Sequence, residues 1–267
     1  MRVRRALVCL IANHVVRNVR GFAATTSLTA KQESWEQQWR KIEEMRKLQP
    51  AAVDTMGADA LARDNGAQDA QFRFQTLIAT MLSPQTRDQQ TMLAFNNLVG
   101  LVDDKPFLAS SLLKHDTTAV EQAIQPVSFY KTKAKNIIAA CEKCVHSHND
   151  DIPERIEDLL TFTGVGPKIA YLTFSIARGE THGICVDTHV HRITNRLGWV
   201  DTWQAKSNGP EKTRLQLEAL LPKDKLDAVN GLVVGFGQTV CEAKKPKCSE
   251  CTLSSSCKYF NDPSHMR

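Results

Sequence analysis

The chain has 267 residues, of which 42% are hydrophobic and 24% charged, with a formal net charge of +5 at pH 7. This length and hydrophobic content suffice for a packed core, which excludes a disordered chain. No stretch approaches the roughly 20 consecutive apolar residues of a membrane-spanning helix, so we expect a globular protein without a membrane partner.

The first 32 residues contain six Lys and Arg residues and no Asp or Glu. Apolar residues recur at helical spacing from Val3 to Val15, which predicts a basic amphipathic helix of the mitochondrial import type. A secretory signal fits less well because Asn13 and His14 interrupt its apolar run, and an untargeted tail is the other alternative. We therefore predict a mitochondrial-type targeting segment over residues 1–32, with the nucleus as a second location.

The rest of the chain contains 28 Lys and Arg residues and 29 Asp and Glu residues. The overall positive charge therefore says little about nucleic-acid binding, and any basic surface must be local. Two local clusters are present, Lys131/Lys133/Lys135 and Lys244/Lys245/Lys247.

The predicted elements are all helices. Apolar residues at spacings of three and four predict a first helix over residues 35–48, ended by Pro50, and residues 51–70 are acidic and less periodic. The same periodicity predicts helices over residues 72–81, 88–99, 119–124, 131–144, 156–160, 167–178, 189–197, 211–221 and 226–240. Gly100, Gly179 and Gly198 each follow an apolar segment, where they predict left-handed helix ends. The predicted fold class is all-α.

Cys141 and Cys144 form an isolated Cys-x2-Cys pair close to His146 and His148. A second metal site is one interpretation of this pair. Both cysteines, however, belong to one apolar stripe of the predicted helix over residues 131–144, so we favour core packing.

Residues 159–170 predict two helices joined by a tight turn. Gly164, Val165 and Gly166 form the turn, and Pro167 is suited to the first position of the second helix. Free backbone amides at the start of that helix would bind an anion such as a DNA phosphate. Taken alone, this motif also fits an ordinary turn between helices.

Near the C-terminus, four cysteines are spaced as Cys-x6-Cys-x2-Cys-x5-Cys, namely Cys241, Cys248, Cys251 and Cys257. Four thiolates within 17 residues are suited to a soft metal centre, and the lysines and polar residues between them make a poor core segment. Zinc sites usually pair two short Cys-x2-Cys units, but only one is present here, so zinc and an iron-sulfur cluster both remain open.

With these features in this order, the chain resembles the endonuclease III family from about residue 33 to residue 260. The resemblance rests on residues 159–170, the Val-Asp-Thr-His-Val-His-Arg run at 186–192, the cysteine spacing, and residues 82–88 and 129–135. The cysteine spacing matches the family at every position, which implies a [4Fe-4S] cluster with zinc as the minor alternative.

The family resemblance implies a bifunctional DNA N-glycosylase and abasic-site (AP) lyase in base excision repair. Lys168 would be the nucleophile that attacks the deoxyribose and nicks the strand through a Schiff base. It lies in the first turn of a predicted helix, whose positive dipole end disfavours the ammonium form. Asp187 would stabilise the positive transition state, although it is equally suited to cap the following helix.

Within the superfamily, adenine-specific relatives carry the cluster without this lysine, and oxidised-guanine relatives carry the lysine without the cluster. Having both implies oxidised pyrimidines in damaged double-stranded DNA as the substrate, with the damaged nucleotide flipped out. The alternatives are an adenine glycosylase and a non-catalytic DNA-binding or redox-sensing protein. The resemblance implies DNA contacts by Gln85, Phe129, Gly164, Val165, Gly166, His189, Lys244, Lys245 and Lys247.

The resemblance also implies two helical lobes with DNA in the cleft between them. A six-helix barrel lobe with the helix-hairpin-helix would span residues 67–181. An iron-sulfur lobe would join residues 33–66 to residues 182–260. We expect the protein to act as a monomer.

Overall fold

The computed structural model describes residues 24–64, 69–102, 106–205 and 207–262. All regular structure within these ranges is helical, so the prediction of an all-α fold is confirmed. None of these helices combines the length and apolar character that crossing a membrane requires. The predicted targeting helix over Val3–Val15 lies outside the described residues.

The helices follow one another along the chain with short connections. They are α1 (Ala24–Leu48), α2 (Ala52–Met56), α3 (Ala58–Asp64), α4 (Asp69–Leu82), α5 (Asp88–Leu101), α6 (Ala109–Leu112), α7 (Thr117–Ala123), α8 (Tyr130–Ser147), α9 (Ile156–Leu159), α10 (Pro167–Arg178), α11 (Thr188–Leu197), α12 (Gly209–Leu220), α13 (Ala228–Thr239) and α14 (Lys258–Asn261), with 3₁₀ turns at Lys223–Lys225 and Ser254–Ser256.

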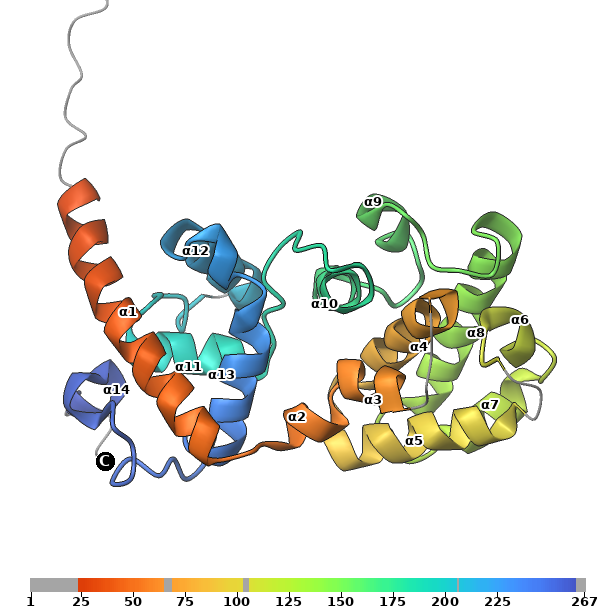
Figure 1. Ribbon diagram of the computed structural model, residues 1–267, viewed down its shortest axis with the longest axis horizontal. Coiled ribbons are helices and arrows are strands. Elements are labelled where there is room, and N and C mark those ends of the chain that lie inside the picture. Colours follow the sequence, from red (N-terminus) through yellow and green to blue (C-terminus); the bar gives the residue numbers. More distant parts are fainter. Residues whose placement is uncertain (1–23, 65–68, 103–105, 206, 263–267) are drawn as a thin grey trace, which may run out of the picture.

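Buried side chains form two separate hydrophobic clusters, which divide the molecule into two lobes (Figure 1). The first cluster runs from Leu61 to Phe174 and fills the lobe of α3 to α10. The second joins Trp35–Met45 of α1 to residues between Ile184 and Leu253. The chain thus starts in the second lobe, crosses to the first through α2, and returns after α10. The exact domain bounds given above remain a prediction.

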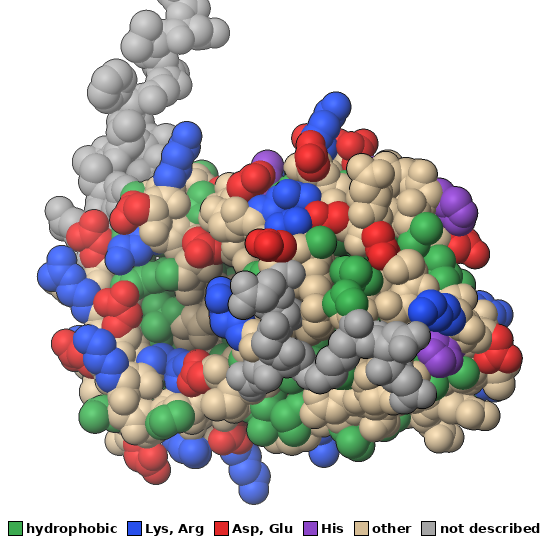
Figure 2. Space-filling view, turned by 45° about the vertical axis from the view of Figure 1, so that its right-hand side comes forward, with side chains coloured by type: hydrophobic (Ala, Val, Ile, Leu, Met, Phe, Trp, Pro, Cys, Tyr) green, Lys and Arg blue, Asp and Glu red, His purple; other side chains and the backbone are tan. Residues whose placement is uncertain are grey.

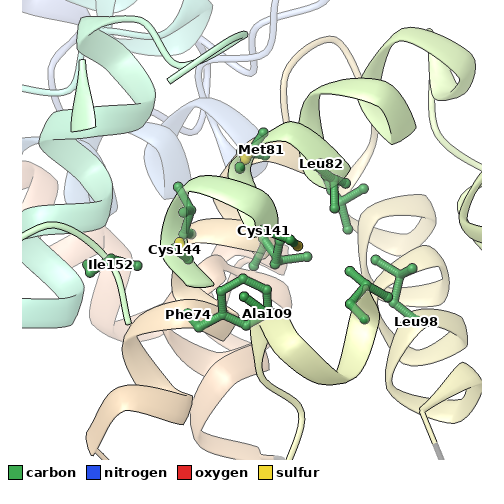
Figure 3. Packing of buried hydrophobic residues seen from close by; sticks show 14 of the residues in the cluster. Phe74, Met81, Leu82, Leu98, Ala109, Cys141, Cys144 and Ile152 are labelled. Carbon is green, nitrogen blue, oxygen red and sulfur yellow. The ribbon is translucent and has the colours of Figure 1, made fainter. Parts of the chain in front are cut away.

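In the first lobe, α8 presents one apolar face to the core (Figure 3). Cys141 and Cys144 lie on this face, are fully buried, and pack among apolar side chains that include Phe74. Burial raises the pKa of the Cys144 thiol to about 12 and that of the Cys141 thiol well above its ordinary value. The prediction that these two cysteines are core residues is therefore confirmed.

In the second lobe, α1 packs its predicted apolar face inward. Trp35, Trp39, Ile42 and Met45 are each no more than 8% exposed, and the Trp39 ring stacks on Trp199 with a centroid distance of 6.1 Å. The helix begins at Ala24, earlier than the predicted start at residue 35.

Four short helices of four to seven residues, α2, α3, α6 and α14, were not predicted, whereas the equally short α7 and α9 were. So few residues show a period of 3.6 only weakly, which makes prediction of such helices uneven. Gly179 and Gly198 end their helices in the left-handed conformation as predicted, with φ of 67° and 79°. Gly100 does not end a helix, because α5 continues to Leu101. Leu101 and Val102 pack against the first cluster, which offsets the roughly 1 kcal/mol cost of a helical glycine.

Helix α13 of the second lobe is tied to the first lobe at both of its ends. At one end, the Gln238 side chain donates to an Asp88 carboxylate oxygen of α5 at 2.6 Å and accepts from the Val53 amide of α2 at 3.0 Å. At the other end, Ser175 of α10 donates to Asp227. The two lobes are therefore joined by polar contacts about one helix length apart.

Candidate active site

A solvent-open cleft of about 1380 Å³ lies between the two lobes. The first lobe contributes the loop between α4 and α5 and the start of α10. The second lobe contributes the start of α11 and one side of α13. Lining side chains include Gln85, Asp88, Lys168, Asp187, His189, Asn230 and Gln238. The hairpin motif with Lys168 and the motif at 186–192 with Asp187 belong to different lobes, and both line this one cleft.

Lys168 is placed by a helix-hairpin-helix, in which α9 and α10 are joined by a tight turn. Gly164 adopts a left-handed φ of 79°, and the Val165 amide donates to the Phe162 carbonyl at 3.0 Å. Pro167 begins α10, so Lys168 lies in its first turn, partly buried. Farther along α10, the Thr173 hydroxyl forms a 2.8 Å hydrogen bond with the Thr80 hydroxyl on α4, which fixes α10 to α4 within the first lobe.

Asp187 is the N-cap of α11, as one of the two predicted roles requires. Its carboxylate accepts from the Val190 amide at 2.8 Å, and the side chain is partly buried. Asp187 lines the same cleft as Lys168. Burial raises the pKa of the neighbouring Cys185 thiol to about 12, and the charges of Lys168 and Asp187 also act on this thiol. The capping role leaves a second carboxylate oxygen available to the cleft.

His189 is the second residue of α11 and also lines the cleft. Burial, assisted by the Arg192 guanidinium, lowers the pKa of His189, and the Asp187 carboxylate acts in the opposite direction. Arg192 donates to His189 Nδ1 at 3.2 Å, so the neutral ring carries its proton on Nε2. At neutral pH His189 is therefore an uncharged hydrogen-bond donor at the cleft.

Gln85 and Phe129 occupy two loops of the first lobe, and both adopt a left-handed backbone, with φ of 56° and 58°. Gln85 is exposed and lines the cleft. Phe129 is 67% exposed, unusually so for an aromatic side chain, and precedes α8. Left-handed backbone is uncommon for residues other than glycine, which indicates that the surrounding structure determines both loops.

The predicted lysine cluster Lys131/Lys133/Lys135 does not form one basic surface. Lys131 and Lys135 are exposed, but the Lys133 side chain turns inward and is only 8% exposed. Helical geometry explains the difference, because residues two apart on a helix point in different directions. Elsewhere, acidic and basic side chains are interspersed on the face that Figure 2 shows, in keeping with the balanced charge beyond residue 32.

The four C-terminal cysteines line a single small pocket, together with apolar residues and Arg196. Arg196 donates to Cys241 Sγ at 3.4 Å and to the carbonyls of Glu242 and Ala243. No group of three or more His, Cys, Asp or Glu side chains within the described ranges converges as a single metal ion requires. The four thiols nevertheless share one pocket.

The loop between the first two of these cysteines carries the second lysine cluster. Lys244 and Lys245 are exposed. Lys247 is exposed as well but donates to the Thr239 carbonyl at 2.9 Å and lies 3.7 Å from Glu242. Lys247 is therefore held back against its own loop, whereas Lys244 and Lys245 extend toward solvent.

Asp88, Asn230 and Gln238 line the cleft although the sequence did not identify them as site residues. Asn230 donates to the Cys185 carbonyl at 3.1 Å, two residues before Asp187, and Gln238 holds Asp88. Asp88 lies within the motif at 82–88, which was a signal for it. Asn230 and Gln238 stand on an apolar helix, and nothing in the sequence marks them.

Comparison with known proteins agrees with this geometry. A family model described as "HhH-GPD superfamily base excision DNA repair protein" matches residues 78–223, which include the hairpin, Lys168 and Asp187. "Endonuclease III-like protein 1" of Gallus gallus is 41% identical over 225 residues, covering 84% of this chain and 77% of that protein. "Endonuclease III homolog 1, chloroplastic" of Arabidopsis thaliana is 38% identical, with this chain spanning 59% of its length.

Among solved structures, "Structure of a Trapped Endonuclease III-DNA Covalent Intermediate: Estranged-Adenine Complex" is similar at a TM-score of 0.65 and 26% identity, covering 79% of this chain and 95% of that one. The similarity therefore extends over both lobes and nearly the whole of the solved chain. The protein belongs to the endonuclease III family, within the HhH-GPD superfamily of base excision DNA repair proteins.

Proposed function

We propose that this protein is a bifunctional DNA N-glycosylase and AP lyase that removes oxidised pyrimidines from duplex DNA and nicks the strand. The observation that carries the proposal is that Lys168 and Asp187, which come from different lobes, line one cleft. Family membership supports the reaction class, and the trapped endonuclease III–DNA covalent intermediate supports an enzyme–DNA bond in a relative.

Lys168 would act as the nucleophile. Its neutral amine attacks C1′ of the damaged nucleotide, and the C1′–N bond breaks with its electron pair leaving on the base. The amine then loses its proton, and the C1′–O4′ bond breaks to give an iminium at C1′, with O4′ taking the electron pair and a proton. Loss of a proton from C2′ next expels the 3′ phosphate by β-elimination, which nicks the strand.

Asp187 would stabilise the positive charge that develops on the sugar while the base departs. Its Oδ1 is occupied by the Val190 amide, and this hydrogen bond fixes the carboxylate at the start of α11. A carboxylate held in advance by its own helix needs little reorganisation when the charge appears. Capping and catalysis are thus compatible roles for one side chain.

Several groups around the cleft fit a DNA ligand. The turn at Gly164, Val165 and Gly166 leads into α10, whose first amides have no partner within the helix and suit a phosphate. The neutral His189 would donate a hydrogen bond to the strand, and Gln85 with Phe129 would fill the space that a flipped nucleotide leaves. Lys244, Lys245 and Lys247 would add charge along the backbone.

We also propose that Cys241, Cys248, Cys251 and Cys257 hold a [4Fe-4S] cluster. The four thiols line one pocket, and their spacing contains only one short Cys-x2-Cys unit, which suits an iron-sulfur cluster better than a zinc site built from two such units. When bound, the cluster would cross-link the C-terminal loop and so support the lysines on it. Arg196 would donate to the ligand at Cys241.

Two further expectations complete the proposal. Each lobe carries its own hydrophobic cluster and the cleft lies within one chain, which supports action as a monomer. The basic, acid-free segment over residues 1–32 supports import into mitochondria, with the nucleus as a second location.

The test is covalent trapping. Purified protein is incubated with a duplex that carries an oxidised pyrimidine, borohydride is added, and adducts are separated on a denaturing gel. We expect an adduct with the wild type and none with Lys168→Gln, whose base release falls by about three orders of magnitude or more. Lys223→Gln, which removes an exposed lysine outside the cleft, serves as the matched control.

The other results separate the alternatives. Base release without an adduct would indicate a monofunctional glycosylase that uses water, and preference for an undamaged adenine would indicate the adenine-specific class. Binding to DNA with neither release nor adduct would leave a non-catalytic DNA-binding protein. A brown protein with iron-sulfur absorbance supports the cluster, and a colourless protein containing zinc contradicts it.

A further inference from the structure

Lys133 is the one lysine of its cluster that lies inside the protein, 8% exposed on the inner side of α8. Its ammonium group has three hydrogen-bond acceptors, one at the last residue of α4 and two in the loop between α4 and α5. They are the Leu82 carbonyl at 2.6 Å, the Pro84 carbonyl at 2.8 Å and the Thr86 hydroxyl at 3.1 Å. An ammonium group has three N–H donors, so each is used.

These three acceptors surround Gln85. Lys133 thereby holds the backbone before Gln85, at the Pro84 carbonyl, and the side chain after it, at Thr86, while Gln85 itself has a left-handed φ of 56°. The exposed Gln85 side chain lines the cleft, and the Pro84 carbonyl and Thr86 hydroxyl on either side of it accept from Lys133. Lys133 therefore fixes the backbone from which the Gln85 side chain extends.

The hydrogen bonds around Lys133 extend to the loop that carries Phe129. Thr86 Oγ1 also accepts from the Ser128 amide at 3.2 Å, which joins the two loops. The Lys133 amide in turn donates to the Phe129 carbonyl at 3.0 Å. This last bond is the ordinary backbone bond at the start of α8, so the Lys133 side chain acts on the Phe129 loop through the Thr86 hydroxyl and the Ser128 amide.

The arrangement is costly for folding. None of the three acceptors is charged, and burial together with the charge of Lys168 lowers the pKa of Lys133 to about 8. Burying an ammonium group without a carboxylate partner opposes stability. A buried apolar side chain would avoid that cost but could not hold the loop.

We propose that Lys133 is a positioning residue that locks Gln85 and Phe129 into a single wedge, so that both enter the base stack together when a damaged nucleotide leaves it. Its donors are all occupied within the protein, so it acts through the two loops and not by touching DNA. This inference rests on the proposed function, because the wedge matters only if a nucleotide is extruded.

The test compares Lys133→Met on two substrates that carry the same oxidised pyrimidine, one in a paired duplex and one in an unpaired bubble. The wedge should matter most where the stack resists opening, since unstacking costs a few kcal/mol. We expect single-turnover base release to fall about tenfold or more on the duplex, and less than about threefold on the bubble. An equal loss on both substrates would overturn the proposal.

Two variants control this comparison. Lys135→Met removes an exposed positive charge from the same helix without touching the loop, and its effect should be alike on both substrates. In the Gln85→Ala/Phe129→Ala background, adding Lys133→Met should change duplex cleavage by less than about twofold, because the groups it positions are gone. A full additional loss would show that Lys133 acts by another route.

If Lys133→Met does not fold, Thr86→Val tests the same hydrogen bonds by removing the hydroxyl that joins the two loops. We again expect base release to fall on the duplex and much less on the bubble. A 2-aminopurine placed opposite the lesion reports unstacking without any bond cleavage. If the wild type cleaves neither substrate, the proposed function fails. If it cleaves both while Lys133→Met unstacks the 2-aminopurine as well as the wild type does, only the role of Lys133 fails.

Discussion

Asp187 combines a structural contact with a proposed chemical one, and substitutions can separate the two. Asn at this position still caps a helix but carries no charge. We expect Asp187→Asn to keep the free energy of unfolding within a few tenths of a kcal/mol while base release falls about 10²- to 10³-fold.

Asp187→Ala provides the comparison, since it removes the oxygen that accepts from the Val190 amide as well. Its free energy of unfolding should drop by about a further 1 kcal/mol. Urea unfolding and single-turnover release measure the two effects separately. Equal activity of Asp187→Asn and wild type would restrict this residue to its capping role.

For single residues, the sequence predicts a role when the hydrogen-bond partner lies nearby along the chain. Asp187 stands three residues before the amide it caps, so its capping role could be anticipated. Lys133 could not be placed in the same way, because its acceptors lie about 50 residues earlier and only the folded loop brings them to α8. From its neighbours alone it was interpreted as part of an exposed basic cluster.

Among the elements, the hairpin turn depends on Gly164 for two reasons. Its φ of 79° is unfavourable for other residues, and a Cβ atom there would lie 2.2 Å from Asn136 Nδ2 on α8. We expect Gly164→Ala to displace the turn and to weaken DNA affinity at constant salt by about tenfold or more, a loss of about 1.4 kcal/mol or more.

Gly179→Ala is a matched control at the other end of the same helix. It has a similar φ of 67°, but a Cβ atom there meets nothing within 4 Å. This variant should lower stability by about 1 kcal/mol and leave DNA affinity unchanged. Similar losses of affinity in both variants would mean that backbone strain alone, and not the contact with Asn136, is responsible.

Helix prediction succeeded where a helix carries its own apolar stripe. Long helices such as α8 and α10 show several turns of that pattern, and their bounds agree with the sequence to within a few residues. The short α2 packs on α5 and α13, and the short α3 packs on α4, so both depend on contacts that lie outside their own residues. The Gly100 error has the same origin, since burial beyond the glycine extends α5.

For the whole molecule, the Gln238 bridge should couple the unfolding of the two lobes. All four tryptophans, Trp35, Trp39, Trp199 and Trp203, lie in the second lobe, so their fluorescence reports that lobe while far-UV circular dichroism reports both. In urea we expect the two signals to coincide for the wild type and to separate for Gln238→Leu, which loses the bonds to Asp88 and Val53. The variant should also lose about 2 kcal/mol of stability.

Gln122→Leu, at an exposed position on α7, is the control for a Gln-to-Leu change away from the interface. Its two signals should coincide as in the wild type. Coincident transitions in Gln238→Leu would mean that the apolar contacts around α2, or the bond between Ser175 and Asp227, suffice to couple the lobes.

The two-lobe organisation was predictable because the family motifs occur in a fixed order along the chain. The contacts that hold the two lobes together were not predictable. Gln238 and Asp88 are 150 residues apart, and each is an ordinary polar residue in its own helix. Sequence therefore predicts what each lobe contains better than how the lobes meet.

Attachment of α13 at both ends has a mechanical consequence for damage search. A joint fixed at two points about one helix length apart resists rotation of one lobe against the other, so a duplex that does not fit the cleft would have to bend to enter it. Bending a short duplex costs about 1–6 kcal/mol, and the cost falls where a base pair is weakened. A rigid protein would thus sense lesions first as soft points in the duplex, before any chemical group of the damaged base is examined.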